Sequence, residues 1–245
     1  TTGDHNIAIG SSAGAGITTA NDTVFIGGNA GQAVTVTGGS GEYDGTVGIG
    51  KSALQALTSG EGNVAIGYQA LDAEDDGDFN TAVGFQALTA QAGTSGEVSN
   101  TAVGYKAATA ITKGRYNTAI GEETLVTEDV GDSSTAIGYK ALFYQNSDSD
   151  NETTGNTGVG YGTGYRNVTG QNNTWLGYSA GLGGVGSNSN NVGVGSNALL
   201  AITTGSTNIA VGARALTTIT TGSENTVVGF QSAQAFSNAE TGNIS

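Results

Sequence analysis

The stretch NVAIGYQAL at residues 63–71 recurs as NTAVGFQAL at residues 80–88 and as NIAVGARAL at residues 208–216. Related nine-residue motifs occur thirteen times in the 245-residue chain, each aligned on one glycine. These motif glycines are Gly10, Gly27, Gly50, Gly67, Gly84, Gly104, Gly121, Gly138, Gly160, Gly177, Gly195, Gly212 and Gly229. Successive motif glycines are 17, 23, 17, 17, 20, 17, 17, 22, 17, 18, 17 and 17 residues apart. A short, sustained period of this kind is typical of a solenoid, in which each unit contacts its neighbours.

Composition favours one thin solenoid. The 245 residues include 43 glycines and no proline, without a Gly-X-Y period, which excludes collagen. Apolar residues make up 36% of the chain and are mostly Ala, Val and Ile, so we expect a thin core without a catalytic pocket. The repeat leaves no stretch for a second core, and residues 1–245 are interpreted as a single repeat domain. Because residues 243–245 begin like a fourteenth motif, we expect the chain to be a segment of a longer fibre.

Charge and cysteine content argue against several classes of function. The chain has 7 basic and 21 acidic residues, giving a formal net charge of -14, and the basic residues are scattered. Nucleic-acid binding needs a clustered positive face, and an acidic chain gains nothing from anionic membrane surfaces. No apolar run approaches the roughly 20 residues that span a bilayer. Without cysteine there are no disulfides and no thiolate metal sites. We therefore predict neither a nucleic-acid partner nor membrane insertion of this segment.

The first half of each motif predicts a short strand. The residue before the motif glycine is aliphatic, and the residue two positions earlier is β-branched, as in Val64 and Ile66. Such alternation predicts a strand whose β-branched and aliphatic face is buried. The residue between them is Ala or Gly in most motifs, and the large Phe25 and Trp175 are among the exceptions. We expect this narrow opposite face to let a second chain approach closely, and a solvent-exposed alanine column is the alternative.

The rest of the motif predicts the turns and the closure of each coil. The motif glycine is expected to adopt a positive φ. Asn opens ten of the thirteen motifs, and its amide can bond to its counterpart one coil away in a stacked ladder. The pair after the glycine, such as Ala70 and Leu71, is expected to begin a second short strand. Two strands per period favour a two-sided parallel β-roll, because a triangular left-handed β-helix would show three such motifs per coil.

Insertions interrupt the period at one place in the repeat. They comprise residues 36–44, 90–98 and 143–153, and all lie between the Ala-Leu pair and the next motif. We expect them to leave one edge of the solenoid, where binding loops are common, and neutral variation in loop length is at least as good an interpretation. The acidic runs 72–78 and 148–152 offer oxygen ligands that suit Ca²⁺. Solvated acidic turns explain them better, so we predict no cofactor and no metal site.

Aromatic residues supply the candidate ligand contacts. An aromatic side chain follows the motif glycine in seven of the thirteen motifs, where rings in register would stack along the solenoid. Such a ladder stabilises neighbouring strands, and saccharides can also stack on exposed aromatic faces. The candidate ligand-binding residues are Tyr68, Phe85, Tyr105, Tyr139, Tyr161, Tyr178 and Phe230 in the motifs, with Tyr43 and Tyr144 in the insertions.

Catalysis and ice binding find less support. His5 is the one histidine of the chain, so a Ser/His or Cys/His nucleophile has no base in the body of the repeats. No two carboxylates are singled out for glycoside cleavage, and we predict no catalytic residue and no enzyme. Six threonines from Thr81 to Thr174 form one column of the motif, as an ice-binding solenoid would require. Because that column shares the predicted buried face, its hydroxyl groups are expected to point inward.

The repeats, such as NVAIGYQAL and NTAVGYKAA, resemble the head repeats of trimeric autotransporter adhesins. They are equally similar to the NTAIGYxAL repeat arrays of phage tail-fibre-like proteins. The resemblance covers essentially the whole chain. It implies an all-β, left-handed parallel β-roll or β-solenoid, here with about 13 coils of ~17 residues, and three chains packed about a common axis. It also implies an extracellular, cell-surface or virion location.

The leading hypothesis is a homotrimeric structural or adhesive segment of an extracellular or virion fibre. It would provide rigidity and multivalent contact with a surface or receptor, such as a host or cell-surface glycan. A purely structural filament subunit without receptor binding is the nearest alternative. A phage polysaccharide depolymerase is the less favoured one.

Overall fold

The computed structural model describes residues 3–35, 45–92, 96–150, 152–234, 236 and 242. These residues form strands and turns, and no helix is found among them. In this part of the chain there is accordingly no helix that could cross a membrane. The chain divides into two compact units, Thr1–Asn117 and Thr118–Ser245. Tyr43 and residues 243–245 lie outside the described residues.

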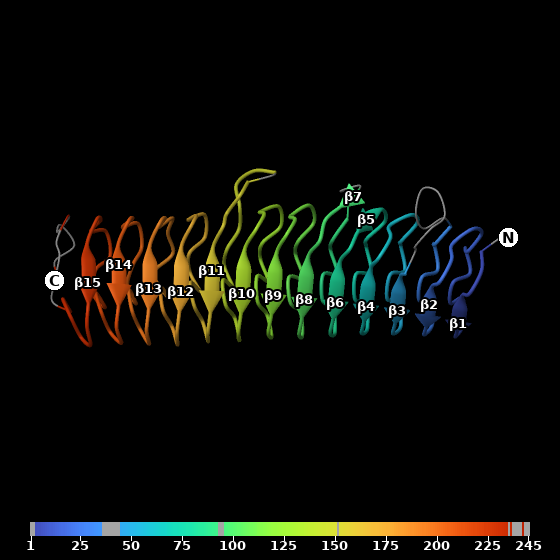
Figure 1. Ribbon diagram of the computed structural model, residues 1–245, viewed down its shortest axis with the longest axis horizontal. Helices are drawn as coiled ribbons and strands as arrows, with labels where there is room; N and C mark the ends of the chain where they lie inside the picture. The colour runs from blue at the N-terminus through green and yellow to red at the C-terminus, as the bar shows by residue number, and fades with distance from the viewer. Residues whose placement is uncertain are drawn as a thin grey trace. The chain divides into compact units, whose positions relative to one another are not determined.

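The motif strands of the first unit form a parallel sheet in which each strand pairs with the next (Figure 1). These strands are β1 (Ile7–Ile9), β2 (Val24–Ile26), β3 (Val47–Ile49), β4 (Val64–Ile66), β6 (Thr81–Val83) and β8 (Thr101–Val103). The register matches motif to motif, so Val64 pairs with Thr81 and Ile66 with Val83. A second, two-stranded parallel sheet joins β5 (Gly77–Asp78) and β7 (Gly96–Glu97).

The second unit repeats the same arrangement. Its motif strands are β9 (Thr118–Ile120), β10 (Thr135–Ile137), β11 (Thr157–Val159), β12 (Thr174–Leu176), β13 (Val192–Val194), β14 (Ile209–Val211) and β15 (Thr226–Val228). All pair in parallel, one motif per coil and in the motif register. The predicted all-β solenoid with coils of ~17 residues is confirmed in both units. Its left-handed sense and the trimer stay predictions.

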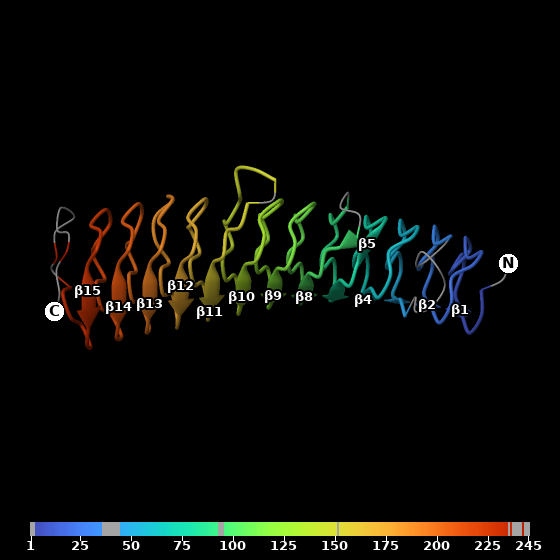
Figure 2. The ribbon, with the colours of Figure 1, turned by 45° about the horizontal axis from the view of Figure 1, so that its top comes forward.

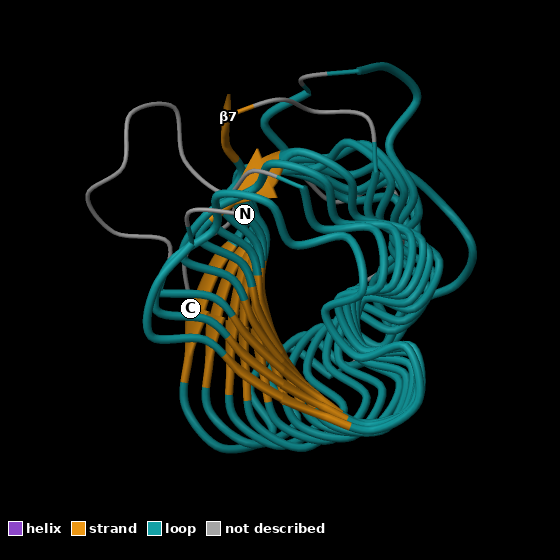
Figure 3. Ribbon diagram, turned by 90° about the vertical axis from the view of Figure 1, so that its right-hand side faces the viewer, coloured by secondary structure: helices purple, strands orange, loops and turns teal. Residues whose placement is uncertain are grey.

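The orientation of the motif strands is the reverse of the one predicted. In every motif strand except β1, the middle residue is buried, as in Ala65 and Ala82, whereas Ile66 and Thr81 on the other face are partly exposed. The small-residue column therefore lines the core, and the β-branched and aliphatic columns lie outside. Strands form one wall of the coil and turns the rest (Figure 3). In a three-residue strand the middle side chain lies on one face and the two outer side chains lie on the other. The sequence pattern shows that these two faces differ in composition, but it does not show which face is buried.

The predicted second strand is also wrong. Residues 68–73 form successive turns, in which Gln69 and Leu71 have φ values of 52° and 53°. The Leu71 amide donates to the Ala87 carbonyl at 3.0 Å, and Ala73 donates to Thr89 at 3.2 Å, so alternate residues still bond to the next coil. Ala70 and Leu71 are consecutive and both buried, which the alternation of a strand would not allow. The leucines of this column supply much of the core bulk.

The motif glycine does adopt the positive φ predicted for it, between 122° and 143° in every motif. At Gly67, a Cβ atom would lie 2.2 Å from the Gly84 carbonyl oxygen of the next coil. The close approach of the next coil's backbone and the positive φ thus both require glycine at this position.

The asparagine ladder is confirmed. Asn63 accepts a hydrogen bond from the Asn80 amide at 2.8 Å and donates to the Gly77 carbonyl at 2.7 Å. In the second unit, the Nδ2 group of a motif asparagine donates to the Oδ1 atom of the motif asparagine one coil earlier, at 3.0 to 3.1 Å. The donors are Asn173, Asn191, Asn208 and Asn225. The side chain thus joins neighbouring coils and closes its own coil.

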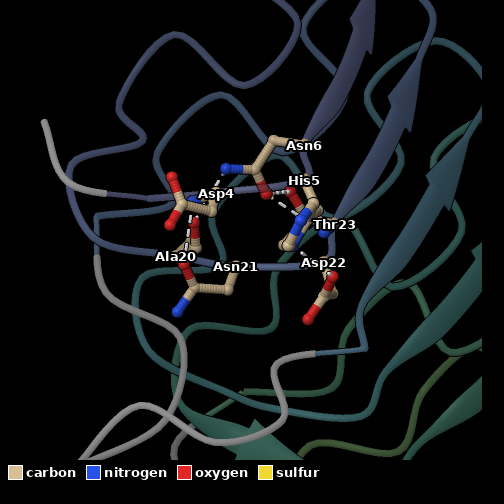
Figure 4. A network of polar contacts seen from close by, with 7 residues as sticks. All are labelled: Asp4, His5, Asn6, Ala20, Asn21, Asp22 and Thr23. Carbon is tan, nitrogen blue, oxygen red and sulfur yellow. Dashed lines mark hydrogen bonds and ion pairs between the residues drawn. The ribbon is translucent and has the colours of Figure 1, made fainter.

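The contact between the first two motifs shows how a substitute fits this ladder. Thr23 replaces asparagine, and its amide and hydroxyl donate to Asn6 Oδ1 at 3.1 Å and 2.7 Å (Figure 4). Asn6 Nδ2 donates to the Ala20 carbonyl at 2.8 Å. The exposed His5 lies beside Asp22, with Nδ1 3.3 Å from Oδ1.

The large residues of the small-residue column point into the core. Phe25 is fully buried, and a Cβ atom at Gly31 or Gly48 would lie 2.4 Å or 2.9 Å from its ring. Trp175 is buried against glycines in the same way. These rings therefore do not obstruct the outer face of the sheet.

The insertions are described in part. Residues 36–44 lie outside the described residues, and so do residues 93–95 of the second insertion. The third insertion is described apart from residue 151; it belongs to the connection from β10 to β11, which Figure 2 shows as a long yellow loop. A common edge for all three insertions stays a prediction.

Candidate functional site

Two aromatic ladders run along the coils, one in each unit. In the first ladder, the Tyr68 and Phe85 ring centroids are 5.1 Å apart and those of Phe85 and Tyr105 are 5.6 Å apart, with interplanar angles of 16° and 21°. The second ladder stacks Tyr139 on Tyr161 at 5.1 Å and Tyr161 on Tyr178 at 5.0 Å, with interplanar angles of 21° and 10°. The predicted stacking is confirmed for these six rings.

This stacking limits how the ladders can meet a sugar. Each ring faces its neighbour along the coils, so the ring edges and tyrosine hydroxyl groups point outward. The outer face of Tyr178 is an exception, because the next coil has the small Ser196 at the equivalent position, and Tyr178 is 57% exposed. Phe230 stands apart from both ladders beside a coil with Ala213 at this position, and is 72% exposed.

A groove of about 340 Å³ lies beside the second ladder. Its lining residues, here called the tyrosine groove, are Tyr139, Lys140, Tyr161, Gly162, Tyr165, Tyr178, Ser179 and Leu182. Gly162 occupies the position held by Lys140 in the coil before and by Ser179 in the coil after. A Cβ atom there would lie 3.6 Å from Leu182 Cδ1, which is ordinary contact. Gly162 thus leaves room in the groove that a side chain at this position could occupy.

A second aromatic cluster adjoins the groove. The Phe143 and Tyr165 rings stack with centroids 5.1 Å apart, and Tyr144 meets their edges at 4.8 Å and 5.2 Å. Tyr144 was a sequence candidate, whereas Phe143 and Tyr165 were missed. Each of the two follows its motif glycine by five residues, and this shared position was the signal that could have found them.

A basic side chain lines the groove. Lys140 Nζ lies 3.1 Å from Glu123 Oε2, and 5.1 Å and 5.2 Å from the ring centroids of Tyr139 and Phe143. The pKa of Lys140 is raised by its hydrogen bond to Tyr139 and by Glu123. Burial and the neighbouring Tyr144 raise the pKa of Tyr165, while Lys140 and Arg166 act in the opposite direction. Of the chain's 7 basic residues, Lys140 lines the groove, and Arg166 follows the lining residue Tyr165 and acts on its charge.

The acidic run 72–78 brings three carboxylates together. Ligand oxygens of Glu74, Asp75 and Asp76 lie within 4.8 Å of one another. Glu74 is fully buried, and its Oε1 atom accepts hydrogen bonds from the amides of Asp75, Asp76 and Gly77 at 3.0, 3.2 and 2.7 Å. Its Oε2 atom is buried without a hydrogen-bond partner. Burial raises the pKa of Glu74 to about 7.

Glu128 shows that this arrangement is a structural device of the repeat. It stands at the equivalent position of another coil, and its Oε1 atom accepts from the amides of Asp129 and Gly131 at 3.1 and 2.8 Å. Its Oε2 atom accepts from Gln145 Nε2 at 2.8 Å and from Ser147 at 3.2 Å. A buried carboxylate that closes this turn is thus explained without an ion, and Glu74 carries no prediction of a Ca²⁺ site.

The outer face of the motif strands is the other candidate surface. The two outward residues of each strand, here called the sheet face, are Ile, Val, Leu or Thr in all thirteen motif strands. Ile66, Leu176 and Val228 are among its exposed members, at 38%, 46% and 61%. The threonine column from Thr81 to Thr174 lies on this face, so the prediction that its hydroxyl groups point inward is wrong.

Comparison with known proteins gives no match: no family model, no curated protein and no solved structure matches this chain. The resemblance to adhesin heads and tail-fibre arrays therefore stays a prediction. The sheet face and the tyrosine groove are the two surfaces from which function can be argued.

Proposed function

We propose that the chain is a structural and adhesive segment of an extracellular or virion fibre, and that it assembles as a homotrimer through the sheet face. The small-residue column was expected to mediate this contact, but it lines the core. The sheet face takes over the role because it is the outward, apolar side of the same strands.

The absence of charge from the sheet face carries this proposal. The chain has 7 basic and 21 acidic residues, yet none of them occupies an outward position of a motif strand. Copies of a chain with a net charge of -14 repel one another, so they associate best through an uncharged surface. Burial of exposed Ile, Val and Leu then contributes roughly 25 cal/mol per Å² of apolar surface. In-register strands place β-branched or aliphatic side chains at the same positions in every coil, which suits a continuous contact between identical copies.

Sedimentation of the purified chain at micromolar concentration tests the trimer. Ile137→Lys places a charge on the sheet face of β10 and is expected to dissociate the trimer without loss of the β signal in circular dichroism. Asn197→Lys is the matched control, because Arg214 occupies the equivalent turn position at a similar φ, 60° against 59°. A wild-type chain that sediments as a monomer, or an Ile137→Lys variant that stays trimeric, refutes assembly through this face.

The adhesive part of the proposal draws on the aromatic ladders. Their exposed edges repeat from coil to coil, and a trimer would present them three times, which favours multivalent glycan contact. Glycan-array binding that disappears in the Tyr105→Ala and Tyr139→Ala double variant supports receptor contact. A blank array for the wild-type trimer favours the purely structural spacer.

A polysaccharide depolymerase is the less favoured function. His5 is exposed and paired with Asp22, and the described carboxylates single out no acid and nucleophile pair. Loss of polymer length on incubation of a capsular polysaccharide with the chain would support the enzyme.

A further inference from the structure

We propose that the tyrosine groove binds an acidic oligosaccharide, with a sugar carboxylate beside Lys140 and Arg166 and sugar hydroxyl groups along the tyrosine edges. The inference rests on the proposed adhesive function and names the class of ligand. It also confines binding to three coils of the second unit, whereas the ladders alone would favour any coil.

The repeat is broken at this place in a way that builds a site. Aromatic side chains follow the motif glycine by one residue in many coils, but by five residues in two coils, at Phe143 and Tyr165. Among the described residues, the groove is where the two aromatic columns face each other, across the missing side chain of Gly162. Leu182 continues the second wall in the next coil. A purely structural ladder would need neither the second aromatic column, Phe143 and Tyr165, nor a glycine at position 162.

The groove offers hydrogen bonds more than flat ring faces. Tyr139, Tyr161 and Tyr178 stack on one another, so a ligand in the groove meets their edges and hydroxyl groups. Each phenol both donates and accepts hydrogen bonds, and the hydroxyl of Ser179 adds another such group. This chemistry suits a polyhydroxylated ligand. One sugar ring can in addition stack on the uncovered face of Tyr178.

Charge selects an acidic ligand over a neutral one. Lys140 is partly neutralised by Glu123 at 3.1 Å, and Arg166 adds a second cation near Tyr165. The rest of a chain with a net charge of -14 repels anions, so a carboxylate gains most where basic residues gather. A carboxylate and a guanidinium or ammonium group form charge-assisted hydrogen bonds, which are the stronger ones. Neutral sugars could accept hydrogen bonds from these cations but would lack the attraction between opposite charges.

Titration calorimetry at low ionic strength tests the inference with hexamers of galacturonic acid, hyaluronan and sialic acid, and with a neutral galactose hexamer. At least one acidic hexamer is expected to bind at least tenfold more tightly than the neutral one, and its affinity should fall with added salt. Gly162→Gln fills the groove, and Gln69 and Gln86 show that the position accepts glutamine at a positive φ. This variant is expected to weaken binding of the acidic hexamer at least tenfold.

Matched variants separate the groove from general effects. Asn197→Gln changes the same turn position in a coil outside the groove and is expected to bind like the wild type. Lys140→Gln with Arg166→Gln keeps the groove open and is expected to weaken acidic binding severalfold and to flatten its salt dependence. This second variant tests the inference even where Gly162→Gln disturbs the fold.

The outcomes distinguish this inference from the proposed fibre. If no acidic hexamer binds to a wild-type trimer, the inference of ligand binding in the groove is refuted, whereas the proposed fibre function is not affected. Equal affinity for acidic and neutral hexamers overturns the charge argument, and wild-type affinity in a folded Gly162→Gln variant overturns the location. A monomer that still binds an acidic hexamer through the groove refutes the trimer alone.

Discussion

In the core of the second unit, the most informative contact to perturb is the packing of the large Trp175 side chain against glycines. Trp175 is fully buried in the middle of β12, where most motif strands have Ala or Gly. Space for its ring comes from Gly164 and Gly181, which stand where several other coils have Leu, and from Gly193 of β13. A Cβ atom at Gly181 would lie 2.3 Å from Trp175 Cδ2, and one at Gly193 would lie 2.8 Å from Cε3. The indole and the glycines therefore form one packing unit.

Substitution of both partners should restore part of the unfolding free energy that is lost when either partner is changed alone. Trp175→Ala leaves a cavity and is expected to cost about 3–5 kcal/mol of unfolding free energy. Gly181→Leu alone drives a side chain into the indole and is expected to cost about 3 kcal/mol. In the double variant the leucine fills the space that the indole vacates, at a φ of 59° close to the 51° and 52° of Leu142 and Leu199. We expect the double variant to exceed Trp175→Ala in stability by about 2 kcal/mol, a strongly non-additive result.

Urea unfolding followed by far-UV circular dichroism measures these differences, because Trp175 is the single tryptophan and fluorescence is lost with it. Repeat arrays can unfold in stages, so hydrogen exchange of individual amides should accompany the midpoints. The amide of residue 181, which donates to the Ala198 carbonyl at 2.9 Å, reports on this coil. Additive losses, with the double variant less stable than either single variant, would refute the packing argument.

Three further predictions concern the strand orientation, the glycine turns and a buried carboxylate. Ala119→Leu points into the core and is expected to cost about 1–3 kcal/mol in urea unfolding, against about 0.5 kcal/mol or less for the outward Thr118→Leu; the opposite order would contradict the orientation. Gly84→Ala brings Cβ to 2.2 Å from the Gly104 carbonyl oxygen at a φ of 143°, and an unchanged melting temperature would count against its strain. Because burial raises the pKa of Glu74 from 4.5 to about 7, the neutral form stabilises the fold fully below pH 4.5, and this contribution is lost as the pH rises through 7. Glu74→Gln should recover up to about 3 kcal/mol at pH 8, and urea titrations with the same pH profile for both proteins would rule this out.

Several features of the coil could be predicted because one residue type has few structural uses. A glycine at every motif position indicated a dihedral angle that other residues resist, and Gly67 adopts it at 143°. An asparagine such as Asn191 can both donate and accept, so its recurrence indicated a ladder between coils, which Asn191 and Asn173 form. These inferences needed no knowledge of the tertiary fold.

The site was harder to predict because its residues come from coils of unequal length. Tyr139, Tyr161 and Tyr178 follow motif glycines directly and were found by alignment on them. Phe143 is the first residue of the insertion 143–153 and Tyr165 follows it, where the spacing of motif glycines rises to 22 residues, and their shared position was overlooked. The groove itself depends on the absence of a side chain at Gly162, which the motif does not mark.

The sequence by itself determined a parallel solenoid with one motif strand per coil, its glycine turns and its asparagine ladder, because local dihedral and hydrogen-bonding demands repeat with the motif. Only the tertiary structure decided which face of each strand is inside. Residues with a positive φ, such as Leu71, turn the chain sharply, and their own side chains fill the interior. Ala65 therefore lines the core, whereas Ile66 lies outside. Those turns set the space inside each coil, and in most coils that space admits one small side chain from the strand. The apolar columns that were expected to form the core became the sheet face.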